Sequence, residues 1–233
     1  MTDTNVEIVR VFVGADGSGG SPLGVVVDGA AAPGVPVRQE IARQLGFSET
    51  VFVDDTARGT VDIYTPSARL PFAGYPLIGA AWVLRERGVP VDVLRPPAGD
   101  AATWVEGGFT WIRGRAEWVS GKRTQQFASA AEVDALPAPP PGEGWLYAWA
   151  WQDEAAGTVR ARGFPRRGDA ITEDEATGAA AMLLADELGR DLRIRQGVAS
   201  EIVARVSGEG WTEVGGRVAA AEVRPLPQVT GVS

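Results

Sequence analysis

The residue types missing from this chain restrict the chemistry that it can perform. The 233-residue sequence contains no histidine and no cysteine, which excludes imidazole bases, thiolate nucleophiles, disulfides and His- or Cys-based zinc sites. Its one lysine, Lys122, lies in Ser120-Gly121-Lys122-Arg123, which we interpret as a turn. Carboxylates therefore remain for proton transfer near neutral pH, with Tyr64, Tyr75 and Tyr147 as auxiliaries.

Glu49 is the carboxylate whose sequence surroundings suit a general base. It lies in a polar triplet, Ser48-Glu49-Thr50, that leads into an apolar strand. A carboxylate beside Phe47, Val51 and Phe52 can have its pKa raised by desolvation toward the working range of a general base. The alternative is a solvated glutamate at a strand end, which is the commoner situation for an arbitrary glutamate.

The elements around Glu49 are repeated later in the chain. A strand over residues 60–65 leads through a loop to an apolar helix that ends at Gly88. A strand over residues 158–164 leads through a polar loop to a second apolar helix, which ends at Gly189. The order of elements is the same in both places, which predicts a duplicated α+β half.

This repeat divides the chain into an N-terminal half, residues 1–108, and a C-terminal half, residues 109–233, with return of the last strand to the first half as an option. The long helices begin near Gly74 and Gly178, so each presents free N–H groups and the positive end of its dipole. If the two ends converge, they form a binding site for a carboxylate or another small anion. In the alternative, the glycines only allow tight turns and the helices never meet.

Composition argues against several other classes of protein. The net charge of −8 and the isoelectric point near 4.7 disfavour nucleic-acid binding, which requires clustered basic residues. No apolar run approaches the ~20 residues that span a bilayer, and Met1 to Asn5 lack the features of a signal peptide. We therefore expect a cytoplasmic protein that binds neither nucleic acid nor membranes. No phosphate loop, flavin site or metal cage is recognisable, so no cofactor and no metal are expected.

Four motifs occur together: Gly20-Ser21-Pro22, Ser48-Glu49-Thr50, the stretch from Thr65 to Pro76 that includes Leu70-Pro71-Phe72-Ala73-Gly74, and Glu173-Asp174 with Ala176-Thr177-Gly178. In order and spacing they resemble the phenazine-biosynthesis PhzF-like family, and the resemblance spans nearly the whole chain. It implies the diaminopimelate-epimerase-like fold, an α+β architecture of two pseudo-symmetric halves, each a mixed or antiparallel sheet wrapped around a central helix. It also implies a homodimer.

The same resemblance implies roles for individual residues. Glu49 would be the general acid/base that moves a proton between carbons of a small unsaturated carboxylic acid, and Asp174 would be the second carboxylate of the cleft. The predicted substrate-binding residues are Ser21, Gly74, Tyr75, Gly178 and Ala179. The reaction is implied to need no cofactor.

Departures from the family pattern fall at positions expected to face the substrate. Ser21 stands where the family usually has Asn, Tyr75 where it has His, and Ala179 where it has Ser; Glu175 replaces a common Pro. Each of the first three alters or removes a hydrogen-bonding group, so we expect a substrate other than the phenazine precursor. The alternative is a non-catalytic binding protein or dimeric scaffold. An enzyme should hold Glu49 and Asp174 in one enclosed pocket, whereas a scaffold allows them to lie apart or in solvent.

Overall fold

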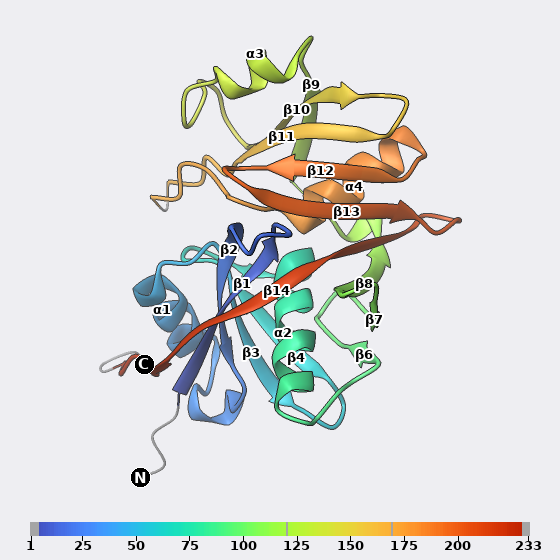
Figure 1. Ribbon diagram of the computed structural model, residues 1–233. Helices are drawn as coiled ribbons and strands as arrows, with labels where there is room; N and C mark the ends of the chain where they lie inside the picture. Colours follow the sequence, from blue (N-terminus) through green and yellow to red (C-terminus); the bar gives the residue numbers. More distant parts are fainter. Residues whose placement is uncertain (1–4, 120, 169, 230–233) are drawn as a thin grey trace.

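The structure, a computed structural model, describes residues 5–119, 121–168 and 170–229, which form two lobes that lie one above the other in Figure 1. Within these ranges no helix is both long and apolar enough to cross a membrane. The strands connect into one 14-stranded sheet that runs through both lobes. Both lobes therefore share a continuous hydrogen-bonded framework.

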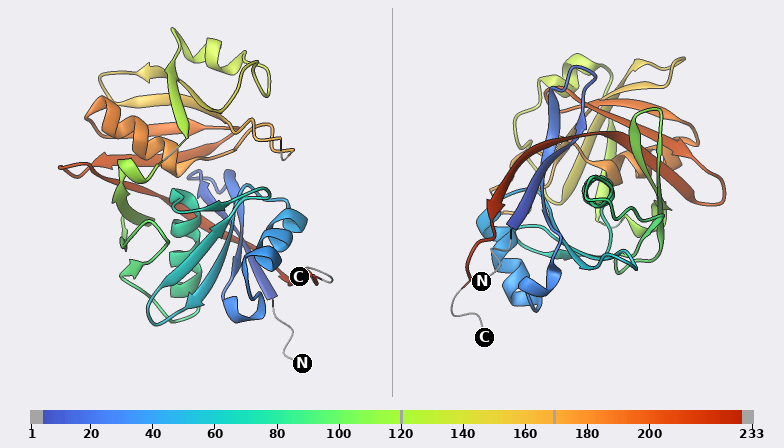
Figure 2. Two further views of the ribbon diagram at one scale, coloured as in Figure 1. Left: turned by 180° about the vertical axis from the view of Figure 1, so that it is seen from behind. Right: turned by 60° about the horizontal axis from the view of Figure 1, so that its bottom comes forward.

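The first lobe is built on the strand order β5-β4-β3-β2-β1-β14. Its early strands are β1 (Asn5–Val13), β2 (Gly19–Val26), β3 (Thr50–Asp55), β4 (Thr60–Tyr64) and β5 (Arg69–Leu70). Its helices are η1 (Gly29–Ala31), α1 (Val35–Leu45) and α2 (Gly74–Glu86). A branch of three further strands, β6 (Val93–Leu94), β7 (Ala101–Glu106) and β8 (Phe109–Arg115), closes over the far side of α2, which Figure 2 shows end-on inside the ring of strands.

The second lobe follows the short helix η2 (Ala116–Trp118). Its strands are β9 (Lys122–Gln126), β10 (Trp145–Asp153), β11 (Thr158–Phe164), β12 (Leu192–Gln196) and β13 (Ser200–Val206). Its helices are α3 (Ala130–Asp134) and α4 (Gly178–Leu188). The last strand, β14 (Trp211–Pro225), pairs with β8 and β13 and then continues along β1 in the first lobe. In Figure 1 it crosses the molecule as a long diagonal ribbon.

The two lobes bury their parts of the sheet in the same way. In β3, Val51 and Val53 pack into the cluster around α2, whereas Phe52 between them packs on the α1 side. In β10, Trp145, Tyr147 and Trp149 face the α4 cluster, whereas Leu146 and Ala148 face α3. Successive strand residues point to opposite faces, so each sheet is covered by a long helix on one face and a short helix on the other. The predicted α+β architecture is confirmed, while the division at residue 108 stays a prediction.

The long helices differ from ordinary surface helices because their N-terminal turns are buried around the whole circumference. From Gly74 to Leu84 only Trp82 of α2 escapes full burial, and Gly178 to Met182 of α4 are all buried. A helix that is apolar on every side belongs in a core. Both helices are therefore held firmly enough that their N-terminal ends have defined positions.

Candidate active site

The N-terminal ends of α2 and α4 meet at the junction of the two lobes. A Cβ atom added at Gly74 would lie 2.9 Å from the carbonyl carbon of Gly178 and 3.0 Å from the amide nitrogen of Ala179. A Cβ atom at Gly178 would lie 3.0 Å from the amide nitrogen of Tyr75. Glycine is needed at both positions because the two backbones approach each other, which excludes the alternative that these residues serve local turns only.

Neither helix end is capped by a side chain. Ala73, before α2, has no capping group, and Thr177, before α4, makes no capping hydrogen bond. A threonine at this position usually accepts a hydrogen bond from an amide of the first turn. Thr177 instead directs its hydroxyl to Asp174, with 2.6 Å between Oγ1 and Oδ2. The first-turn amides of both helices therefore keep their positive electrostatic character at the junction.

Asp174 is buried at this junction and accepts hydrogen bonds from several hydroxyl groups. Its side chain is 3% exposed. Oδ2 accepts from Thr177, and Oδ1 accepts from the hydroxyls of Ser48 at 3.1 Å and Ser21 at 3.4 Å. Burial raises the pKa of Asp174, and the hydroxyls of Thr177 and Ser48 oppose this rise. These donors stabilise the charged form of Asp174, so they limit the rise in its pKa that burial causes.

Glu49, directly before β3, is equally buried but is much less well supplied with donors. It is 8% exposed, and within the described part of the chain its buried Oε2 has no hydrogen-bond partner. Burial, reinforced by the negative charge of Asp174, raises the pKa of Glu49 to about 7. A carboxyl group with a pKa near 7 can both accept and return a proton at neutral pH. Glu49 and Asp174 are thus a pair of carboxylates whose surroundings differ.

Tyr75, in the first turn of α2, connects the helix end to Glu49. Its hydroxyl oxygen accepts a hydrogen bond from the backbone N–H of Glu49 at 3.0 Å and donates to the carbonyl of Pro22 at 3.5 Å. Burial and the nearby carboxylates raise the pKa of Tyr75 well above its ordinary value, so it stays a neutral hydroxyl. Tyr75 fixes the backbone that carries Glu49, and its hydroxyl also interacts with the Glu49 carboxyl, which opposes the rise in the pKa of Glu49.

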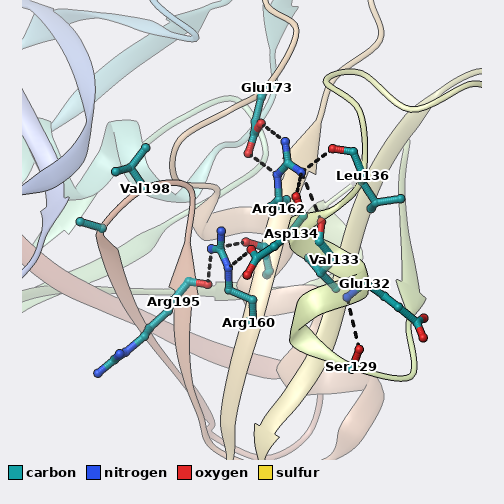
Figure 3. Close-up of polar contacts among 12 residues, drawn as sticks. Ser129, Glu132, Val133, Asp134, Leu136, Arg160, Arg162, Glu173, Arg195 and Val198 are labelled. Atoms are coloured by element: carbon teal, nitrogen blue, oxygen red, sulfur yellow. Dashed lines mark hydrogen bonds and ion pairs between the residues drawn. The ribbon is translucent and has the colours of Figure 1, made fainter.

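The loop that carries Asp174 is anchored on both sides. Arg162 of β11 forms a two-pronged ion pair with Glu173, with Nε–Oε1 and Nη2–Oε2 distances of 2.8 and 2.6 Å (Figure 3). On the other side, Glu175 accepts hydrogen bonds from the backbone N–H groups of Val198 and Ala199 in the turn between β12 and β13. Glu175, which stands where the family commonly has Pro, therefore ties the loop to this turn.

Gln196, at the end of β12, is a residue of the site that sequence reasoning missed. Its side-chain amide donates to the carbonyl of Asp174 at 2.8 Å and to the hydroxyl of Thr177 at 2.9 Å. Its carbonyl accepts from the N–H of Thr177 at 3.0 Å and from the hydroxyl of Tyr147 at 3.0 Å. All four groups of the contact are buried, so Gln196 holds Asp174 and the start of α4 together. No sequence signal distinguishes this glutamine from others in a strand.

Lys122 corrects the interpretation of residues 120–123 as a turn. Lys122 is the first residue of β9 and pairs in parallel register with Trp145 of β10; Ser120 lies outside the described residues. The positive charge of Lys122 acts on both Glu49 and Asp174 and lowers the pKa of each. Arg167 has the same effect on both carboxylates. The signal available in the sequence was that Lys122 is the only lysine.

The seven predicted site residues all lie at this junction: Ser21, Glu49, Gly74, Tyr75, Asp174, Gly178 and Ala179. Their predicted roles stay predictions. A cleft of about 530 Å³ runs between the β1–β2 loop and the β12–β13 turn, and Gln196 is part of its lining. Asp16, Arg160 and Arg195 line this cleft, and neither Glu49 nor Asp174 does. Among the described residues, no group of three or more carboxylates is arranged to hold a metal ion.

Comparison with known proteins shows what this chain is similar to. Residues 9–96 match the family model of phenazine biosynthesis-like proteins, PhzC-PhzF. The family resemblance predicted from the sequence is confirmed. The matched region of this chain contains Ser21, Glu49 and Tyr75 and ends before the loop that carries Asp174.

Three individual proteins illustrate the similarity. An uncharacterized isomerase from Pasteurella multocida is 45% identical over 75 residues, which are 30% of this chain and 25% of that protein. A trans-2,3-dihydro-3-hydroxyanthranilate isomerase from Pseudomonas fluorescens is 40% identical over 68 residues, or 28% of this chain and 24% of that protein. The chain thus matches about a quarter of the length of these relatives. The PhzF-family phenazine biosynthesis protein of Bacillus anthracis shares its fold, with a TM-score of 0.69 and 17% identity over 96% of this chain and 99% of that chain.

Proposed function

We propose that this PhzF-like chain is an isomerase that moves a proton within a small carboxylate-bearing metabolite, with Glu49 as the acid/base and Asp174 as its partner. The observation that carries the proposal is the state of Glu49. Its carboxyl group is buried, its Oε2 atom lacks a hydrogen-bond partner among the described residues, and its pKa is raised to about 7. An unpartnered buried oxygen is costly in a folded protein, and proton transfer to and from a substrate would account for it.

The proposed step needs no oxidant, and the product has the same atoms as the substrate. Ionised Glu49 takes a proton from one carbon of the substrate, so that a C–H bond breaks and its electron pair passes into the conjugated system. Protonated Glu49 then gives a proton to another carbon, where a C–H bond forms. Asp174 stays anionic, and its charge raises the proton affinity of Glu49.

The ends of α2 and α4 supply the other half of the proposed chemistry. Negative charge builds up on the substrate when carbon loses a proton. The uncapped amides beyond Ala73 and Thr177 and the dipoles of both helices can stabilise that charge. Because the backbones of Gly74 and Gly178 are packed against each other, these groups are held in place before the substrate arrives.

The substrate is proposed to differ from the phenazine precursor. Ser21 and Tyr75, which replace the usual Asn and His of the family, contact the two candidate catalytic carboxylates directly or through their backbone. Ala179 offers only its backbone N–H at the start of α4. The relatives named as isomerases support the reaction type, while homodimer formation and a cytoplasmic location stay predictions from the sequence.

A second candidate, a non-catalytic binding or scaffold protein, is favoured by one observation. Neither Glu49 nor Asp174 lines the 530 Å³ cleft, although Gln196 of the site does. A catalyst needs access for its substrate to the two carboxylates, whereas a scaffold does not.

Proton NMR in D₂O distinguishes the two candidates. A panel of small unsaturated and amino carboxylates, dihydro-hydroxyanthranilate included, is incubated with the wild-type protein, with Glu49→Gln and with Glu117→Gln, an exposed control. We expect deuterium incorporation with the wild type and the control, and none with Glu49→Gln. Incorporation that survives in Glu49→Gln would exclude Glu49 as the base. A panel without any incorporation would favour the binding or scaffold function.

A further inference from the structure

Lys122 is held on the face of the second sheet that carries the candidate site. In β9 it lies in register with Trp145, and its Nζ atom is 5.0 Å from the centre of the Trp145 ring. Thr124, two residues along and so on the same face, bonds to Glu187 near the end of α4. The side chain of Lys122 therefore points toward α4 and not out of the edge of the sheet.

Trp145 links Lys122 to the environment of Asp174. A Cβ atom at Gly163 would lie 2.8 Å from Trp145 and 2.9 Å from the hydroxyl of Thr177, so ring and hydroxyl meet above this glycine. The carbonyl of Gly163 in turn accepts a hydrogen bond from the N–H of Asp174 at 2.8 Å. The Trp145 ring thus contacts the ammonium group and lies beside the segment that carries Asp174, and both carboxylates act electrostatically on Lys122.

No carboxylate satisfies this ammonium group at short range. Among the described residues, none has a carboxylate oxygen within 4 Å of Nζ, and no hydrogen bond to Nζ is formed. Burial lowers the pKa of Lys122, although Glu49 and Asp174 oppose the shift. This cation is partly desolvated, lies over an aromatic ring and lacks an ion pair. An anion that bound to it would form a stronger interaction than the contact with the ring.

We propose that Lys122 is a specificity-determining residue of the candidate site, where its ammonium group pairs with the carboxylate of the substrate. That the bound carboxylate is a substrate rests on the proposed function; that Lys122 binds a carboxylate does not. Lys122 selects carboxylates over uncharged analogues of the same shape, because an amide in that place would leave the ammonium group without an anion.

The charges of the site agree with an anionic ligand. Glu49 and Asp174 alone would repel a carboxylate. Lys122 offsets part of this repulsion because its positive charge acts on both groups, and near neutral pH Glu49 is partly protonated. The negative charge that opposes a carboxylate ligand is therefore reduced.

A single lysine makes the test direct. Protein labelled with ¹³C,¹⁵N-lysine gives one side-chain Cε signal, which belongs to Lys122. The probes are benzoate, anthranilate and 3-hydroxyanthranilate, each paired with its amide, at concentrations up to 50 mM. We expect the carboxylates, and not the amides, to shift this signal in the wild type and in Glu49→Gln.

Variants at Lys122 measure its contribution to binding. Lys122→Met should weaken carboxylate binding about 10- to 100-fold, as expected for loss of a charged hydrogen bond, and Lys122→Arg should recover most of it. Arg123→Met is the matched control, since Arg123 is exposed on the opposite face of β9; it should bind as the wild type does. Thermal unfolding of each variant verifies that it is folded.

The outcomes separate this inference from the proposed function. If carboxylate binding depends on Lys122 but no deuterium is incorporated, the role of Lys122 is supported and the isomerase function is contradicted. If deuterium is incorporated and Lys122→Met leaves KM within twofold of the wild type, the role of Lys122 is contradicted and the isomerase function is supported. A Lys122 signal that no carboxylate moves, or that amides move equally, would also overturn it.

Discussion

Glu49 and Asp174 enter the same junction from opposite lobes, and the difference between them lies in hydrogen bonding and not in burial. Both are less than 10% exposed. Three hydroxyl groups donate to Asp174, whereas Oε2 of Glu49 lacks a partner among the described residues. Burial disfavours the charged form of both groups, but only Asp174 is well compensated. A duplicated fold can thus provide two similar positions while local donors decide which one holds the proton.

The largest effect that follows from this comparison is on the pH dependence of stability. Glu49 has a pKa of about 7 in the folded protein and near 4.5 when unfolded. Between these values the folded state binds more protons, so the free energy of unfolding falls as pH rises through this window. The loss amounts to roughly 3 kcal/mol by pH 8. Glu49→Gln should remove it, which urea unfolding of both proteins between pH 4.5 and pH 8 would measure.

The comparison also predicts the relative order of the two proteins. At pH 8 Glu49→Gln should be the more stable, because the wild type must keep a charged carboxylate buried with an unsatisfied oxygen. At pH 4.5 the two should be similar. Parallel stability curves for the two proteins would mean that Glu49 is ionised throughout, and would remove the contrast with Asp174.

A smaller effect is expected when Asp174 loses its shortest donor. Thr177→Val keeps the shape of the side chain but removes the 2.6 Å hydrogen bond to Oδ2. At pH 8 we expect a loss of about 1 to 3 kcal/mol in the free energy of unfolding. The pKa of Asp174 should rise further, so the deficit should shrink as the pH is lowered and Asp174 becomes protonated.

Thr124→Val is the matched control for this variant. Thr124 also donates to a carboxylate, at 2.5 Å to Glu187, but that contact is exposed to solvent. Exposed contacts of this kind contribute little, so Thr124→Val should change stability by less than about 0.5 kcal/mol. Equal losses in the two variants would show that burial of Asp174 does not determine the cost.

Most of the long elements could be predicted from the sequence because their periodicity is strong. The helix between Gly74 and Gly88 and the strand over residues 158–164 were predicted with nearly the observed bounds. The site residues in contiguous motifs, Glu49 and Asp174 among them, were also identified. Lys122 and Gln196 were not, since both reach the site through strand pairings between distant segments. The spacing of residues within one segment carries no information on which distant segments pair, so the positions of Lys122 and Gln196 could not be predicted.

Ser21→Ala should have the smallest effect on this comparison. Ser21 is the most distant of the three hydroxyl donors to Asp174, at 3.4 Å against 3.1 Å for Ser48 and 2.6 Å for Thr177. Hydrogen bonds weaken with distance in this range, and Asp174 keeps two donors without Ser21. We expect a loss within about 0.5 kcal/mol at pH 8, with Ser48→Ala intermediate, measured by urea unfolding. If Ser21→Ala costs as much as Thr177→Val, the three donors act as one unit, and the proton affinity of Asp174 is then a property of the whole junction.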